Sequence, residues 1–157
     1  MWRLAATADD DDIVSMCLSL NAKDPGPYSV QPAQVKRTLS KLREDPTRGR
    51  ALVCEVAGHP VGYAFLISFW SNELGGEVCT VDELFVLPDY RGRGLGTVLL
   101  EKLAEAEQSL WPVPPAALTL EVTARNHRAR ALYERLGFEG ENLAMRRRLM
   151  PQRQHRD

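Results

Sequence analysis

The chain has 157 residues, 44% of them hydrophobic, which is enough to bury about two thirds of the unfolded surface in one core. Its formal net charge of -1, from 20 basic and 21 acidic side chains, provides no global attraction to a polyanion and argues against nucleic acid or an anionic membrane as partner. No apolar run approaches the roughly 18 residues of a membrane span, and the first residues do not resemble a signal peptide, so we expect a cytoplasmic protein.

The first part of the chain predicts one short strand followed by two helices. Residues 2–6 suit a strand, and the acidic run that begins at Asp9 favours a helix start, because negative charge stabilises the positive end of a helix dipole. We expect this helix to reach about residue 21 and to be broken by the proline-rich segment 24–28. A second helix is expected over residues 32–43, where apolar side chains recur on one face.

From residue 50 onward the apolar residues follow the pattern of strands. Residues 51–56 and 61–67 are rich in β-forming side chains and flank a turn at 58–60, which predicts a hairpin. Residues 78–86 predict a further strand. The glycine pair at 75–76 suits another antiparallel connection before it.

The remaining elements are a helix over 94–110, a strand over 117–122, a helix over 126–136 closed by Gly137, and a terminal strand over 143–149. Both element types, with a hairpin and one strand-helix-strand crossover, predict an α/β fold with a mixed sheet. We expect one domain over residues 1–150 and a flexible tail over residues 151–157.

A glycine-rich loop separates the strand 78–86 from the helix that follows. Gly92, Gly94 and Gly96 let several backbone amides approach a diphosphate, and the helix start adds partial positive charge. A Walker loop would end in Gly-Lys-Ser/Thr, and a dinucleotide fingerprint starting at Gly92 would need Gly or Ala where Thr97 stands. The loop alone therefore indicates either an anion site or a turn with a purely geometric role.

The segment from Val81 to Gly96 resembles the acetyl-CoA motif of the GCN5-related N-acetyltransferases (GNAT). The core pattern of that motif, Arg/Gln-x-x-Gly-x-Gly/Ala, is matched by Arg91, Gly94 and Gly96. The family's second cofactor motif is resembled by Asn126, Ala129, Leu132, Tyr133, Gly137 and Phe138. The resemblance covers nearly the whole chain and implies a GNAT fold, with a mixed, mostly antiparallel central sheet of six to seven strands flanked by about four helices.

For the cofactor, the resemblance implies that acetyl-CoA is the acyl donor and that no metal is needed. Main-chain groups of the strand are expected to bind pantetheine, main-chain amides of the loop to bind the pyrophosphate, and Asn126 to bind the cofactor through its side chain. The full set is Leu84, Phe85, Val86, Arg91, Gly92, Arg93, Gly94, Leu95, Gly96, Thr97 and Asn126.

Acyl transfer to an amine needs a neutral nucleophile, a stabilised oxyanion and a proton for the departing thiolate. Tyr133 matches the family's general acid, and a phenol with an ordinary pKa near 10 stays protonated at neutral pH. Asp82 and Glu83 resemble the acidic pair of the polyamine and thialysine acetyltransferases with the two acid types exchanged, which leaves the base open between Asp82, Glu83 and a water, with Glu121 on the adjacent strand as a third carboxylate candidate. Because Asp82 and Glu83 are adjacent on a strand, we expect them to point to opposite faces.

The acceptor is usually set in this family by two loops, here residues 25–30 and 70–76. Tyr28 and Trp70 from these loops, with Glu121 on the neighbouring strand, are candidates for binding it. The implied function is direct acetyl transfer, in a ternary complex, to a primary amine of a small molecule such as a polyamine or an amino acid. A protein acceptor and a non-catalytic CoA-binding regulatory module stay open as alternatives. Dimers are common in the family, which makes a homodimer a candidate assembly.

The cysteines and histidines provide no pattern for a metal or a nucleophile. Cys17, Cys54 and Cys79 are far apart and odd in number, which matches neither a disulfide framework nor zinc-ligand spacing. We expect all three to be small buried apolar residues.

Overall fold

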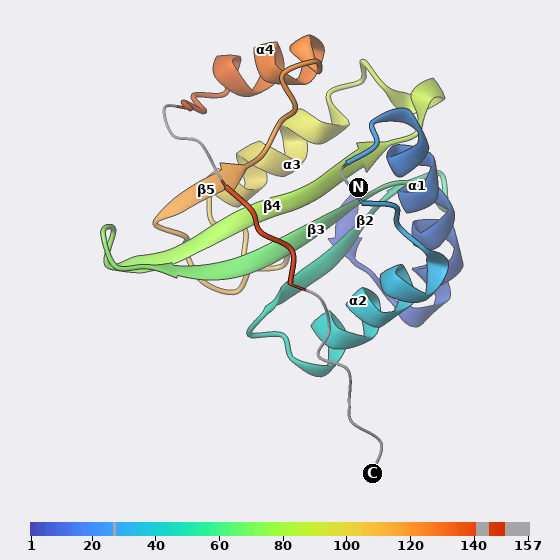
Figure 1. The fold of residues 1–157 in the computed structure, drawn as a ribbon, viewed down its shortest axis with the longest axis horizontal. Helices are drawn as coiled ribbons and strands as arrows, with labels where there is room; N and C mark the ends of the chain where they lie inside the picture. The colour runs from blue at the N-terminus through green and yellow to red at the C-terminus, as the bar shows by residue number, and fades with distance from the viewer. Residues whose placement is uncertain (27, 141–144, 150–157) are drawn as a thin grey trace.

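The computed structural model describes residues 1–26, 28–140 and 145–149. Within them lies one mixed sheet of five strands in the order β1-β2-β3-β4-β5, with four α-helices (Figure 1). The strands are β1 (Trp2–Leu4), β2 (Gly49–Val56), β3 (His59–Ser71), β4 (Gly76–Val86) and β5 (Ala117–Leu120). The helices are α1 (Asp10–Lys23), α2 (Pro32–Glu44), α3 (Leu95–Ala104) and α4 (His127–Arg135).

The sheet is antiparallel from β1 to β4, and only β5 runs parallel to its neighbour. A parallel pair needs a crossover, and α3 provides it between β4 and β5. This arrangement confirms the predicted mixed, mostly antiparallel sheet and the four helices.

Two apolar cores cover the two faces of the sheet. Helices α1 and α2 pack on one face, where Ile13 and Leu39 contact the aromatic side chains of Tyr63, Phe65 and Phe85. Helix α3 packs on the other face through leucines that contact side chains of β2, β3 and β4. Figure 1 shows α1 and α2 on the side of the sheet opposite to α3. None of the helices in the described ranges has the length and apolar character that a membrane crossing needs.

The prediction of six to seven strands is wrong for the part of the chain that the structure describes. The terminal strand was expected over residues 143–149, of which 145–149 pair with no strand, and Met145 is 95% exposed. Alternating apolar and basic residues fit a pleated strand, but a strand also needs a partner that accepts its main-chain bonds, and alternation does not provide one. Residues 143–144 and the expected flexible tail over 151–157 lie outside the described residues.

Helix α3 ends at Ala104, earlier than the expected end near residue 110. Ala106 adopts a left-handed φ of 60°, which no α-helix accommodates, and the chain turns there. Leu110 and Trp111 are nevertheless buried in the α3-side core, so the apolar spacing that suggested a longer helix reflects packing after a turn.

A β-bulge in β4 decides where the acidic pair points. Glu83 pairs with Phe65 and Val81 with Leu66, which leaves Asp82 as the extra residue. Val81 faces the α3-side core, and unbroken alternation would turn Glu83 the same way. The bulge instead turns Glu83 to the α1 face, where its carboxylate accepts a hydrogen bond from the Tyr63 hydroxyl at 2.7 Å.

Candidate active site

The strands β4 and β5 pair only over their first four positions, from Val78 with Ala117 to Val81 with Leu120. Beyond that point β5 ends while β4 continues to Val86 (Figure 1). The Leu87 N–H donates to the Val61 carbonyl, so by antiparallel alternation Phe85 bonds to β3 while Leu84 and Val86 present their main chain to the opposite edge. Among the described residues no strand pairs with this edge of β4 beyond Val81, and of its main-chain groups there only the Val86 carbonyl has a partner, the Arg91 side chain, so the edge can still pair with an extended ligand.

The glycine loop ends in a helix N-terminus with free amides. Gly92 and Gly94 have φ values of 74° and 75°, which glycine adopts without strain. The first bond of α3 runs from the Val98 N–H to the Gly94 carbonyl. Within the described chain, the amides of residues 95–97 donate to no main-chain carbonyl and stay free for an anion.

The side chains of Arg91 and Arg93 stabilise this loop through hydrogen bonds to main-chain carbonyls. The Arg91 Nε donates to the Val86 carbonyl at 2.8 Å, and the guanidinium lies 5.3 Å from the centre of the Phe85 ring. An Arg93 nitrogen donates to the Asp89 carbonyl at 3.1 Å, and this guanidinium lies over the Tyr90 ring. Both side chains stay exposed enough to leave positive charge beside the free amides.

A buried tryptophan from β1 holds the first turn of α3. The Trp2 indole N–H donates to the Leu95 carbonyl at 2.7 Å, and Trp2 is only 5% exposed. Because Leu95 opens the helix, this bond ties the orientation of the free amides to the sheet.

A cavity of about 170 Å³ lies where β4 and β5 part. Its walls come from the end of α1, from β4, from the chain after β5 and from α4; they are Leu20, Asp24, Val81, Asp82, Glu83, Leu84, Leu120, Glu121, Val122, Thr123, Asn126, Ala129 and Tyr133. Four of these side chains are carboxylates and none is basic. The Thr123 hydroxyl donates to Asp24 at 3.4 Å and so connects the α1 wall to the chain after β5.

Tyr133 faces this cavity from α4. Burial raises the pKa of its phenol above the ordinary value, so the hydroxyl is protonated throughout the neutral range. The ring packs against Phe138 at a centroid distance of 5.9 Å, and no residue of the described chain bonds to the hydroxyl. Tyr133 therefore has a proton to donate and no hydrogen-bond partner among the described residues.

Asp82 and Glu83 line the same cavity, contrary to the expectation that only one would face it. The bulge at Asp82 explains this, because it breaks the alternation that would have separated the two side chains. Although Asp82 keeps one face in solvent, the surrounding walls raise its pKa by desolvation, and the nearby Glu121 carboxylate raises it further. Burial likewise raises the pKa of Glu83, against the hydrogen bond from Tyr63, which lowers it.

The other expected residues are divided between the cavity and the surface. Asn126 and Glu121 line the cavity, although the side-chain Oδ1 of Asn126 also caps α4 by accepting from the Ala129 N–H at 3.1 Å. Tyr28 lies outside the lining, with the Arg148 guanidinium 4.6 Å from its ring centre. Trp70 is 67% exposed at the far end of β3 and does not reach the cavity.

The sequence model of the acetyltransferase (GNAT) family matches residues 14–138, which include β4, β5, the glycine loop and Tyr133. The chain belongs to this family. An uncharacterized N-acetyltransferase of Methanocaldococcus jannaschii is 42% identical over 88 residues, a match that covers 55% of this chain. The same match covers 38% of that relative, so the chain spans well under half the length of the curated relative it matches.

Solved structures with the GNAT fold resemble the chain over almost its whole length. A possible acetyltransferase from Clostridium difficile 630 superposes with a TM-score of 0.75 at 19% identity, covering 96% of this chain and 97% of that one. The ribosomal-protein-alanine N-acetyltransferase of Brucella melitensis biovar Abortus 2308 gives 0.72 at 22% identity, covering 95% and 99%. At these identities the similarity establishes the fold.

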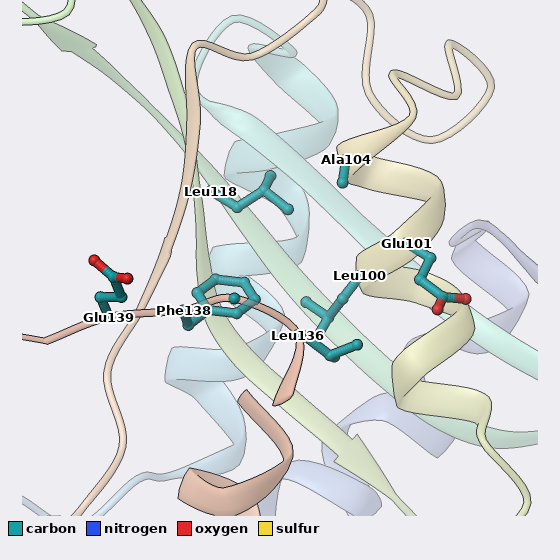
Figure 2. A pocket seen from close by; sticks show the side chains of 8 residues that line it. Leu100, Glu101, Ala104, Leu118, Leu136, Phe138 and Glu139 are labelled. Atoms are coloured by element: carbon teal, nitrogen blue, oxygen red, sulfur yellow. The ribbon is translucent and has the colours of Figure 1, made fainter. Parts of the chain in front are cut away.

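This GNAT chain has a second and larger cavity, of about 290 Å³, on the α3 side of β5 (Figure 2). Figure 2 shows Leu100 and Ala104 of α3 on one side of it, with Leu118 and Phe138 opposite and Leu136 beside Leu100. The cavity shares no lining residue with the acidic one and contains neither Tyr133 nor the free edge of β4. The chemistry of the family therefore favours the smaller cavity.

Sequence reasoning missed the residues that support the site from a distance. Tyr63 lies within an apolar run and Trp2 near the N-terminus, so each looked like ordinary core. Cys17 was expected to be buried, and it is; its thiol also lies 3.5 Å from Glu83. Among the described residues no three potential ligands are grouped so that they would hold a metal ion.

Proposed function

We propose that this chain is an acetyl-CoA-dependent N-acetyltransferase whose acceptor is a primary amine of a small cationic molecule, such as a polyamine or an amino acid. The observation that carries the proposal is one cavity in which a protonated tyrosine and an acidic pair meet the free edge of β4. The proposal treats residues 1–150 as one catalytic domain acting in the cytoplasm.

The donor side uses mainly backbone groups. The main chain of Leu84 and Val86 would pair with the amides of pantetheine as an added strand does. The free amides of residues 95–97 and the charge of Arg91 and Arg93 would hold the pyrophosphate. The side chain of Asn126, at the start of α4, would contact the cofactor from the other wall.

The reaction balances with the groups in the cavity. The acceptor ammonium gives one proton to a carboxylate of the acidic pair, and the neutral nitrogen attacks the thioester carbon to form the C–N bond. When the C–S bond breaks, the thiolate takes the Tyr133 proton, and the phenolate recovers a proton from the new amide nitrogen. One ammonium and one thioester become one acetamide and one thiol, and the remaining proton leaves through the carboxylate.

The charge of the cavity supports a cationic acceptor. Asp24, Asp82, Glu83 and Glu121 all line it, and among the described residues the one ion pair that any of them makes is between Glu121 and an Arg146 guanidinium nitrogen at 3.7 Å. Carboxylates grouped in a partly enclosed space raise the local concentration of a cation and favour its binding.

A protein acceptor is the second candidate, supported by the similarity in fold to the Brucella ribosomal-protein-alanine N-acetyltransferase. The bond between Thr123 and Asp24 favours a small molecule, because it connects two walls of the cavity across which an extended peptide would have to lie. A non-catalytic CoA-binding module is disfavoured by Tyr133, whose protonated hydroxyl a binding module would not need.

The test is CoA release by the purified chain with acetyl-CoA and a panel of polyamines, amino acids, aminoglycosides and peptides. We expect the fastest turnover with small di- or polycationic amines, falling as salt screens the cavity. Faster turnover with peptides would transfer the assignment to a protein acceptor. Binding of acetyl-CoA without turnover of any amine would make the chain a CoA-binding module.

A further inference from the structure

The carboxylate of Glu83 has one oxygen held by the protein and one oxygen free. The Tyr63 hydroxyl donates to Glu83 Oε2 at 2.7 Å, and the Cys17 thiol lies 3.5 Å from the same oxygen. No described residue bonds to Oε1, while the side chain lines the acidic cavity. The carboxylate is therefore fixed on its protein side and available on the other.

Tyr63 is itself fixed by packing. It is 0% exposed, and its ring lies 5.2 Å from that of Phe65 and 6.0 Å from that of Phe85. A buried hydroxyl needs a partner, and the bulge at Asp82 is what brings the Glu83 carboxylate within its reach. The bond thus joins a rigid aromatic core to the cavity wall.

The two effects on Glu83 oppose each other. Burial disfavours its ionised form, whereas the Tyr63 bond stabilises that form. A carboxylate that accepts a proton near neutral pH needs both: enough burial to be a stronger base than a free carboxylate, and enough stabilisation to stay ionised. Cys17 from α1 and Tyr63 from β3 contact Glu83, and the titratable groups that line the cavity with it are Asp24 just after α1, Asp82 from β4, Glu121 after β5 and Tyr133 from α4.

We propose that Tyr63, assisted by Cys17, is a positioning residue that holds Glu83 as the general base and directs Oε1 to the acceptor amine. This rests on the proposed function and selects Glu83, rather than Asp82, as the proton acceptor. Asp82 then attracts the ammonium, and Glu83 takes its proton.

The test uses Tyr63→Phe, Glu83→Gln and the double variant of the full chain. Removal of the hydroxyl takes away a bond that stabilises the carboxylate, so the pKa of Glu83 rises and the acidic limb of kcat/KM moves to higher pH, by about one unit. We expect kcat to fall about tenfold at neutral pH while the KM for acetyl-CoA stays within about twofold. In the Glu83→Gln background the same Tyr63→Phe change should have no effect on kcat.

A carboxyl ¹³C titration of Glu83, assigned by its loss in Glu83→Gln, measures the same shift without turnover. An unchanged titration and acidic limb in Tyr63→Phe would overturn the inference, as would an equal fall in kcat in the Glu83→Gln background. Absence of turnover in the unmodified chain would overturn the proposed function instead, and the two failures are therefore distinct. If Tyr63→Phe does not fold, Cys17→Ala should give a smaller shift in the same direction, and no shift would count against the inference.

Discussion

The glycine loop and the acidic cavity are built in different ways. The loop is local: its amides come from consecutive residues at the start of α3, and its conformation depends on Gly92 and Gly94. The cavity is assembled from α1, β4, the chain after β5 and α4, and its chemistry depends on side chains far apart in sequence. The proposed donor site is thus encoded in a short motif, whereas the proposed acceptor site exists only after folding.

Gly94→Val should break the donor site while leaving the acceptor cavity intact. A left-handed residue costs an ordinary side chain about 1–2 kcal/mol and a β-branched one more, so the loop would change conformation and displace the free amides. We expect the affinity for acetyl-CoA to fall at least about 100-fold by titration calorimetry. Gly140→Val is the matched control, because Gly140 has no positive φ and open space at its Cβ position. Retained affinity in Gly94→Val would contradict the loop assignment.

Tyr133→Phe should break the chemistry and spare donor binding. Loss of the hydroxyl removes the acid for the thiolate, so kcat should fall about 100-fold or more. The affinity for acetyl-CoA, measured by calorimetry on the same sample, should stay within about twofold. Unchanged turnover would exclude Tyr133 as the acid.

Asp82→Asn tests only whether the charge of Asp82 attracts the cationic acceptor. Because the carboxylate lies in the cavity beside Glu121, its neutralisation should raise the KM for a dicationic amine about tenfold and weaken the dependence on salt. Asp45→Asn makes the same charge change at a half-exposed carboxylate after α2, outside the cavity lining, and should leave this KM unchanged. Equal effects of the two variants would show that net charge, and not the cavity, attracts the amine.

Trp2→Phe sharpens the comparison, since it tests whether the local loop also depends on a distant residue. Loss of the indole bond to Leu95 should weaken acetyl-CoA binding about fivefold in calorimetry. Trp111→Phe is the matched control, because Trp111 is also buried but its indole nitrogen has no hydrogen-bond partner among the described residues. Both variants should lower the thermal midpoint. Equal losses of affinity would attribute the Trp2 effect to packing.

Much of the fold was predictable because its signals are local. The central strands, the first two helices and the turn at Gly137, with its φ of 84°, follow from spacing, proline and glycine. Sequence spacing failed where an element depends on something distant. The apolar pattern of residues 145–149 found no strand to pair with, and the spacing that reached Leu110 continued past the end of α3.

For the candidate site, the sequence predicted some of the residues that line the cavity and missed others that support it. Tyr133, Asp82, Glu83, Glu121 and Asn126 do meet in one cavity. Trp70 does not, because its place near the end of a long hairpin was set by the length of β3 and β4. The support that Tyr63 gives to Glu83 has no sequence signal, since a tyrosine in an apolar strand looks like any core aromatic.

The sequence by itself determined the glycine loop, the order of the elements and membership of the GNAT family, because each rests on consecutive residues or a fixed spacing. The tertiary structure decided to which face of the sheet Asp82 and Glu83 point, and that Tyr63 holds the Glu83 carboxylate by a hydrogen bond. The reason is the bulge at Asp82: one extra residue against β3 reverses the alternation of β4, and the pairing that produces it lies in another strand.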